Sequence, residues 1–154
     1  MPDVCNGIMK TYYKSGALES ESNYKMGVAV GIHKGYWEDG TLLYSTPFRN
    51  GKKNGVEVYY HKNGKVSSKV PYKDGILNGT SYFYYSNGRL SEYGILTNGV
   101  LNGAYKNYYD NGHIKSKGKY KNGNQVGVWY FYSIDGKYSI QDFDKASIEL
   151  ASIV

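Results

Sequence analysis

The sequence is poor in the features that define several large protein classes. It has one cysteine, Cys5, only three prolines, and no apolar run near the length of a membrane helix, which needs about 20 residues. A single cysteine excludes an internal disulfide framework and fits a reducing compartment. The first residues show no cationic segment followed by an apolar one. We therefore expect no signal peptide and a soluble cytoplasmic protein.

Glycine, in contrast, is abundant and regularly spaced. Seventeen of the 20 glycines fall into three series, each with a period of 24 residues. The series are Gly7, Gly31, Gly55, Gly79, Gly103 and Gly127; Gly16, Gly40, Gly64, Gly88, Gly112 and Gly136; and Gly27, Gly51, Gly75, Gly99 and Gly123. Such spacing indicates a repeat protein whose units bury surface against their neighbours. We expect a single domain, residues 1–154, of about six 24-residue units that start at the first series.

Each unit has the pattern of a β-hairpin. The second glycine series ends short polar turns such as Asp110-Asn111-Gly112, and Asn-Gly between aromatic-rich runs indicates a type I′ turn, with positive φ at both central residues. From Ile114 to Lys121, apolar or small residues alternate with lysines, which is the period of a strand that buries one face. The sequence therefore predicts an all-β fold, an elongated, twisted antiparallel meander of stacked hairpins.

The C-terminal residues depart from the repeat. After Tyr138 the glycines stop, and apolar residues recur at helical spacing. The residues at this spacing are Ile140, Phe143, Ser147, Leu150 and Val154. Because an open sheet edge promotes aggregation, we predict a short amphipathic capping helix within 138–154. No such cover is evident for residues 7–13; we expect a monomer, although pairing of this edge with another copy stays open.

Two sets of side chains are candidate binding surfaces. One strand face mixes aromatic and polar residues, and tyrosine and tryptophan are enriched at interface hot spots. We predict partner contacts from Tyr13, Trp37, His61, Tyr85, Tyr105, Tyr109 and Trp129. The other set is a basic face made of Lys65, Lys69, Lys73, Lys115, Lys117, Lys119 and Lys121. This face either resists aggregation as a solvated surface or attracts an acidic protein, nucleic acid or anionic lipid.

Charge is unevenly distributed, and patterns typical of chemistry are missing. Residues 7–137 carry a net charge of +9, whereas residues 138–154 carry −2. His33, His61 and His113 occupy different offsets in the repeat, so stacking would not gather them. The sequence has no Cys-x-x-Cys or His-x-x-x-His pair for zinc, and its glycines mark turns instead of a phosphate loop. We expect no catalysis, metal, cofactor or small-molecule substrate.

The repeated pattern resembles the bacterial MORN-repeat variant. The residues that carry the resemblance are Tyr84-Tyr85-Ser86-Asn87-Gly88, Tyr108-Tyr109-Asp110-Asn111-Gly112 and Tyr120-Lys121-Asn122-Gly123. It extends from residue 7 to about residue 137. Proteins built only from this variant are commonly assigned as antitoxins or immunity proteins, so the resemblance implies a non-catalytic protein that binds and blocks a cognate toxin. MORN repeats elsewhere are linked to membrane lipids and scaffolding, so an anionic-lipid or nucleic-acid binding module, or a scaffold, is the alternative.

Overall fold

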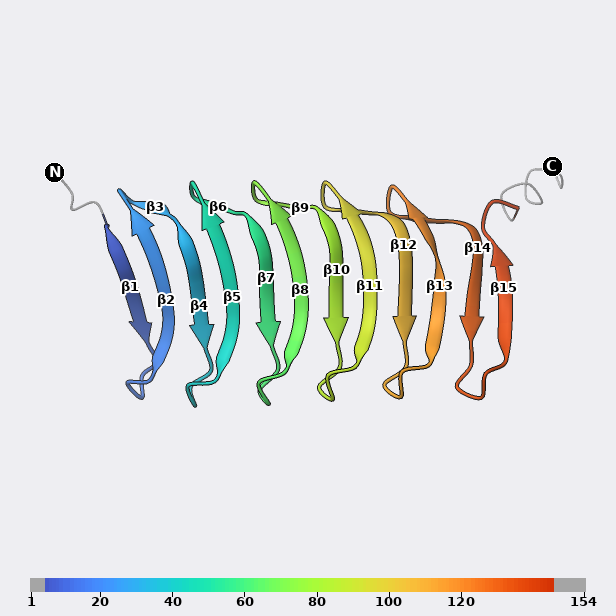
Figure 1. Ribbon diagram of the computed structural model, residues 1–154, viewed down its shortest axis with the longest axis horizontal. Helices are drawn as coiled ribbons and strands as arrows, with labels where there is room; N and C mark the ends of the chain where they lie inside the picture. The colour runs from blue at the N-terminus through green and yellow to red at the C-terminus, as the bar shows by residue number, and fades with distance from the viewer. Residues whose placement is uncertain (1–4, 146–154) are drawn as a thin grey trace. The chain divides into compact units, whose positions relative to one another are not determined.

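The computed structural model describes residues 5–145. All the regular secondary structure in that range is β-strand. The chain divides into two compact units, residues 1–77 and 78–154, and each is described by itself. Within each unit the strands form an antiparallel meander of hairpins (Figure 1), which confirms the predicted all-β hairpin fold. The described residues include no helix with the length and apolar character needed to cross a bilayer.

Unit 1 contains six long strands and three two-residue strands among its described residues. They are β1 (Gly7–Tyr12), β2 (Leu18–Lys25), β3 (Val28–Ala29), β4 (Gly31–Tyr36), β5 (Leu42–Arg49), β6 (Lys52–Lys53), β7 (Gly55–Tyr60), β8 (Val66–Lys73) and β9 (Ile76–Leu77). The long strands are ordered β1-β2-β4-β5-β7-β8, and β3, β6 and β9 pair with β2, β5 and β8. Each short strand thus folds back on the strand before it.

Unit 2 repeats this arrangement with six strands among its described residues, two of which are longer than those of unit 1. The six are β10 (Gly79–Tyr84), β11 (Leu90–Thr97), β12 (Val100–Tyr108), β13 (Ile114–Lys121), β14 (Asn124–Tyr132) and β15 (Tyr138–Asp142). Neighbours in the chain are neighbours in the sheet throughout this unit. β12 and β14 are longer because each includes the connecting residues that form a separate short strand in unit 1.

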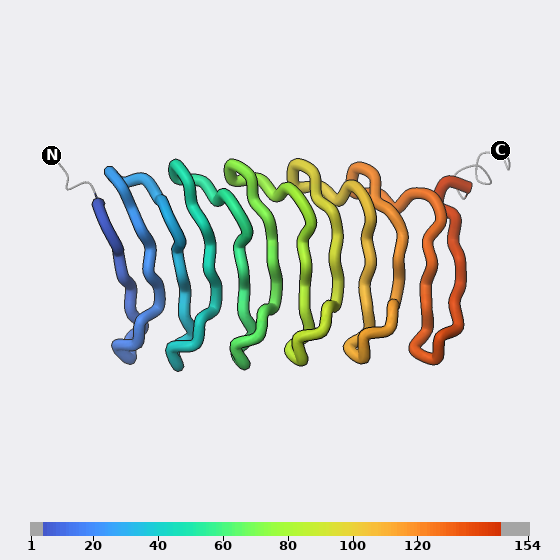
Figure 2. Tube along the Cα trace, in the orientation of Figure 1, coloured from blue at the N-terminus to red at the C-terminus, as the bar shows by residue number. Residues whose placement is uncertain are grey.

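Two kinds of turn alternate along the chain (Figure 2). The turns that end at the second glycine series have loops of three residues. In the turn at Gly112, the Tyr109 amide donates to the His113 carbonyl, and the Gly112 amide donates to the Tyr109 carbonyl. Only the glycine has positive φ, 92° at Gly112. This is a type I turn followed by a left-handed glycine, so the expectation of type I′ turns was wrong here. The Asn111 side chain accepts a hydrogen bond from the His113 amide and selects this geometry instead.

The third glycine series does form the two-residue turn with two left-handed residues. Asn122 and Gly123 have φ values of 51° and 82°, and Lys121 and Asn124 pair across them. Asparagine tolerates this region better than most residues because its short side chain bonds locally. The Gly123 amide also donates to the Leu101 carbonyl, 2.9 Å away, which ties the turn to the preceding repeat.

The predicted C-terminal helix is wrong over the residues that the structure describes. Residues Tyr138–Asp142 form β15, which pairs antiparallel with β14. The open edge of β14 offers these residues a ladder of backbone hydrogen bonds, and that outweighs a helical pattern in so short a segment. Phe143 still packs on the last hairpin, with its ring 6.2 Å from Trp129. Ser147, Leu150 and Val154, the rest of the predicted helix, lie outside the described residues.

The core of unit 2 lies around Trp129, which is 1% exposed. Its ring centroid is 5.1 Å from that of Tyr120 and 5.7 Å from that of Tyr105, and its indole nitrogen donates to the Lys119 carbonyl. Gly118 makes room for this ring, since a Cβ there would lie 2.3 Å from an indole carbon. One face of the sheet therefore carries the aromatic core.

Candidate functional site

A transverse row of side chains crosses unit 2 on the sheet face opposite Trp129. In an antiparallel sheet, directly paired residues share a face. The pairs are Tyr82 with Tyr93, Tyr93 with Lys106, Lys106 with Lys117, Lys117 with Tyr130, and Tyr130 with Ile140. We call these six residues the tyrosine–lysine row. It presents two lysines between aromatic neighbours, and tyrosine is enriched among the hot spots of binding surfaces.

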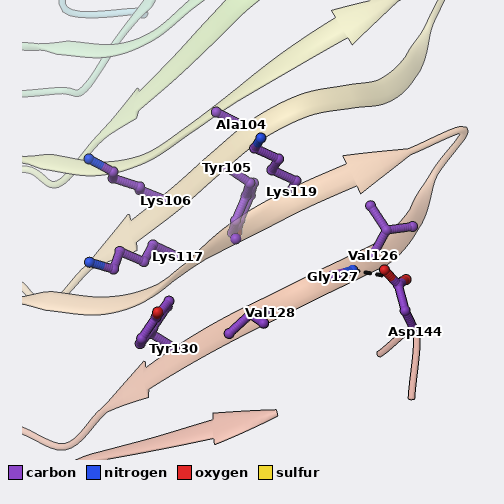
Figure 3. Close-up of a pocket in the computed structure, with 11 residues that line it drawn as sticks. Ala104, Tyr105, Lys106, Lys117, Lys119, Val126, Gly127, Val128, Tyr130 and Asp144 are labelled. Carbon is purple, nitrogen blue, oxygen red and sulfur yellow. Dashed lines mark hydrogen bonds between the residues drawn. The ribbon is translucent and has the colours of Figure 1, made fainter. Parts of the chain in front are cut away.

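A hollow of about 440 Å³ lies over the part of this row on β12, β13 and β14 (Figure 3). Its polar lining includes Lys106, Lys117, Lys119, Tyr130 and Asp144, and its apolar lining includes Ala104, Val126 and Val128. Asp144 is held at the rim, because its Oδ1 accepts a hydrogen bond from the Gly127 amide at 3.0 Å. The hollow thus combines three ammonium groups with an apolar wall.

Among the described residues, Lys117 contacts two aromatic rings, and none of the three lysines of the hollow forms an ion pair. The Nζ atom of Lys117 is 4.8 Å from the ring centroid of Tyr130 and 5.7 Å from that of Tyr132, within the range of cation–π attraction. Within residues 5–145, no carboxylate comes within the 4.0 Å of an ion pair for Lys106, Lys117 or Lys119. Their charges are therefore not neutralised by the described residues.

Three of the tyrosines predicted to contact a partner link one repeat to the next. The hydroxyls of Tyr13, Tyr85 and Tyr109 donate to the backbone carbonyls of Tyr36, Tyr108 and Tyr132, respectively, at 2.7–2.8 Å. These bonds are partly buried. The three side chains therefore have a structural role that the sequence analysis did not anticipate.

Tyr105 and Trp129, also predicted as partner contacts, lie in the core of unit 2. Trp129 has almost no accessible surface, so we leave it out of the proposed surface. The Tyr105 hydroxyl donates to Glu92 at 2.9 Å. Burial, followed by this hydrogen bond and the Glu92 charge, raises the pKa of Tyr105 well above its usual range. Alternation along each strand points both rings to the face opposite Lys106 and Tyr130, although Tyr105 still borders the hollow and Trp129 does not.

The remaining predicted residues are dispersed. Trp37 is half-buried, and its indole nitrogen is buried with no hydrogen-bond partner among the described residues; His61 is also half-buried. Lys115 lies with Nζ 5.8 Å from the ring centroid of Tyr109. The other lysines of the predicted basic face outside the hollow are Lys65, Lys69, Lys73 and Lys121, all exposed. Of that face, the hollow brings together only Lys117 and Lys119.

Unit 1 contains a second polar cluster. Glu57 is 4% exposed and accepts hydrogen bonds from Lys53 at 2.7 Å and from Thr46 at 2.8 Å. Burial lowers the pKa of Lys53, but the hydrogen bond and charge of Glu57 outweigh it and raise that pKa. His33 bonds the Asn23 carbonyl and stacks on Phe48. These groups satisfy one another, which indicates a structural network.

Lys106, Tyr82 and Tyr130 were not among the residues predicted from the sequence. Alternation within the second strand of a hairpin does not show which residues of the first strand lie opposite. Counting outward from the three-residue turn at Asp110-Asn111-Gly112 would have placed Lys106 opposite Ser116, but the register shifts at a bulge between Asn107 and Tyr108 and places Lys106 opposite Lys117. Among the described residues, no group of histidine, cysteine and carboxylate side chains could hold a metal ion.

A family model described as MORN repeat variant matches residues 6–26, 29–50, 53–74 and 101–122, which together are more than half of the chain. No curated protein matches the chain at a significant level.

Proposed function

Because the chain belongs to the MORN repeat variant family, we propose that it is a non-catalytic binding protein that neutralises a cognate toxin in the cytoplasm by covering part of its surface. MORN repeats are generally binding modules. The observation that supports the proposal is the tyrosine–lysine row of unit 2, whose lysines lie beside a hollow and have no ion-pair partner between residues 5 and 145.

The row has the properties of a protein-binding surface. Tyrosine offers a large contact area with little rotamer entropy to lose on binding, and Tyr82 is 37% exposed. Unpaired lysines raise the rate at which an acidic partner is encountered and disfavour basic ones. The proposed contact surface is therefore the row, and no longer Tyr13, Tyr85 and Tyr109, whose hydroxyls hold the repeats together.

Co-expression with the product of the adjacent gene tests this function. We expect that product to inhibit growth when expressed alone, and we expect the chain to restore growth and to co-purify with it. Tyr82→Ala combined with Tyr130→Ala should reduce both effects while circular dichroism shows an unchanged sheet. A neighbour that is neither toxic nor bound would refute the proposal.

The unpaired lysines also support a second candidate, a peripheral module for anionic lipid or nucleic acid. Such binding would weaken steeply with salt, because it depends on neutralised phosphates. Replacing Lys115, Lys117 and Lys119 by Gln should then abolish it. Absence of binding to phosphatidylserine vesicles and to oligonucleotides at low salt would remove this candidate.

A further inference from the structure

The first repeats contain an internal counterpart of the tyrosine–lysine row. In unit 1, Glu21 pairs with Lys10 on one side and with Lys34 on the other. The Lys10 Nζ is 3.0 Å from the Glu21 carboxylate, and the Tyr36 hydroxyl donates to it at 3.0 Å. The hydrogen bonds from Lys10 and Tyr36 hold the pKa of Glu21 below its usual value. Here one carboxylate bonds a lysine and a tyrosine, and a second lysine stands opposite it on the other side.

Four repeats further along, the carboxylate of this arrangement is missing. The residues at the positions of Lys10, Glu21, Lys34 and Tyr36 are Lys106, Lys117, Tyr130 and Tyr132. A lysine thus replaces the glutamate and stands directly opposite another lysine. Like charges directly opposite each other destabilise an antiparallel pair. The position that Glu21 neutralises in unit 1 therefore carries positive charge in unit 2 that no described residue compensates by an ion pair.

The neighbouring residues do not correct this imbalance. Asp144 borders the same hollow, but its Oδ1 is engaged by the Gly127 amide, and it forms no ion pair with the lysines of the hollow among the described residues. Lys119, opposite Ala104, adds a third positive charge. The hollow is open enough for an outside group to reach these lysines.

We propose that this hollow binds a glutamate or aspartate side chain of a protein partner, seated between Lys106 and Lys117 as Glu21 is seated between Lys10 and Lys34. The inference rests on the proposed function, because it names the chemistry of the partner at that surface. An apolar residue next to the acidic one packs against Val126 and Val128, the latter 44% exposed. The partner segment is thus both acidic and apolar.

The surroundings favour a protein segment over a phosphate polymer or a lipid surface. Binding to a phosphate backbone uses a series of cations spaced along the strand. The row continues from the two lysines into Tyr93 on one side and into Tyr130 and Ile140 on the other. Two lysines flanked by rings and valines match a carboxylate with an apolar neighbour.

A titration of the full chain with a short peptide tests the inference. The probe is acetyl-Leu-Glu-Val-Glu-Leu-amide, and the matched control peptide has Gln in place of both Glu residues. Binding is followed by NMR shifts of the backbone amides. We expect shifts at Lys106, Lys117 and Val128, and affinity at least about tenfold lower for the Gln peptide and for the Lys106→Gln, Lys117→Gln double variant. The control variant Lys25→Gln, Lys52→Gln removes equal charge from exposed positions of unit 1 and should bind as the parent does.

Several outcomes would overturn the inference. They are no shifts with the Glu peptide, equal affinity for both peptides, shifts confined to other residues, and tighter binding to phosphatidylserine vesicles or an oligonucleotide than to the peptide. If the peptide fails while the adjacent gene product still co-purifies, the proposed function stands and this inference falls. If the peptide binds but the adjacent gene product does not co-purify, this inference stands and the proposed function falls.

Discussion

The Tyr109 hydroxyl donates a hydrogen bond to the backbone carbonyl of Tyr132 at 2.8 Å, across 23 residues of chain. Tyr85 makes the same bond to Tyr108, at 2.7 Å. In a repeat protein, stability comes from bonds within units and from the interfaces between neighbours. The hydroxyls of Tyr85 and Tyr109 therefore stabilise the interfaces between neighbouring repeats.

Removing one such hydroxyl should destabilise the stacked repeats while the aromatic ring stays in place. Tyr109→Phe leaves the partly buried carbonyl of Tyr132 without its donor, so we expect the free energy of unfolding to fall by about 1 kcal/mol. Urea denaturation measures this change. Tyr138→Phe is the control, because Tyr138 is 63% exposed. Equal stability of Tyr109→Phe and the control would contradict the structural role.

Truncation of Trp129 should cost far more stability. Its ring fills the aromatic core of unit 2, so Trp129→Ala should lower the free energy of unfolding by about 3–5 kcal/mol. Phe83→Ala, at a position 40% exposed, should cost much less. Thermal melting by circular dichroism compares the two variants. A loss of partner binding by Trp129→Ala with unchanged melting would instead place Trp129 at an interface.

Reversing the charge of one lysine in the Lys106–Lys117 pair should raise the free energy of unfolding and weaken binding of the acidic peptide. Lys106→Glu creates the opposite-charge pair that Lys10 and Glu21 form in unit 1. We expect a gain of about 0.2–1 kcal/mol in unfolding free energy, together with loss of binding to the acidic peptide. Urea denaturation and peptide titration of the same sample measure both. A less stable variant would show that the two lysines do not repel each other.

The free energy of unfolding should decrease at alkaline pH because of the raised pKa of Tyr105. Its pKa in the folded state is raised, first by burial and then by Glu92, above the usual tyrosine value of 10.0. The stabilisation from the neutral hydroxyl is therefore complete below pH 10.0 and is lost as pH rises toward the folded-state pKa. The difference in unfolding free energy between the parent and Tyr105→Phe should shrink above pH 10.0. A difference that stays constant with pH would contradict the raised pKa of Tyr105.

The fold was largely accessible from the sequence because its turns are local. Asn122-Gly123 adopts left-handed geometry from its own chemistry, and alternation from Ile114 to Lys121 marks one strand. The turn type at Gly112 was not accessible, because it depends on whether the Asn111 side chain bonds the His113 amide. β15 was mistaken for a helix because the pattern of five spaced residues says nothing about the free edge of β14.

The candidate site was harder to predict because it depends on pairs of strands. Lys117 and Lys119 follow from alternation alone, whereas Lys106 joins them only through the register of β12 and β13. Tyr109 resembles a hot-spot residue in sequence, yet its hydroxyl finds a backbone acceptor in the next repeat. Composition identifies residues suited to an interface, but only the register shows which of them are free to form one.

Titration calorimetry with the purified product of the adjacent gene tests the central claim most directly. Three proteins are compared: the parent chain, the Lys106→Gln, Lys117→Gln double variant, and the Lys25→Gln, Lys52→Gln control. We predict that the dissociation constant rises at least about tenfold for the first variant and is unchanged for the control. Equal affinity of all three proteins, or equal weakening by both variants, would contradict binding at the tyrosine–lysine row.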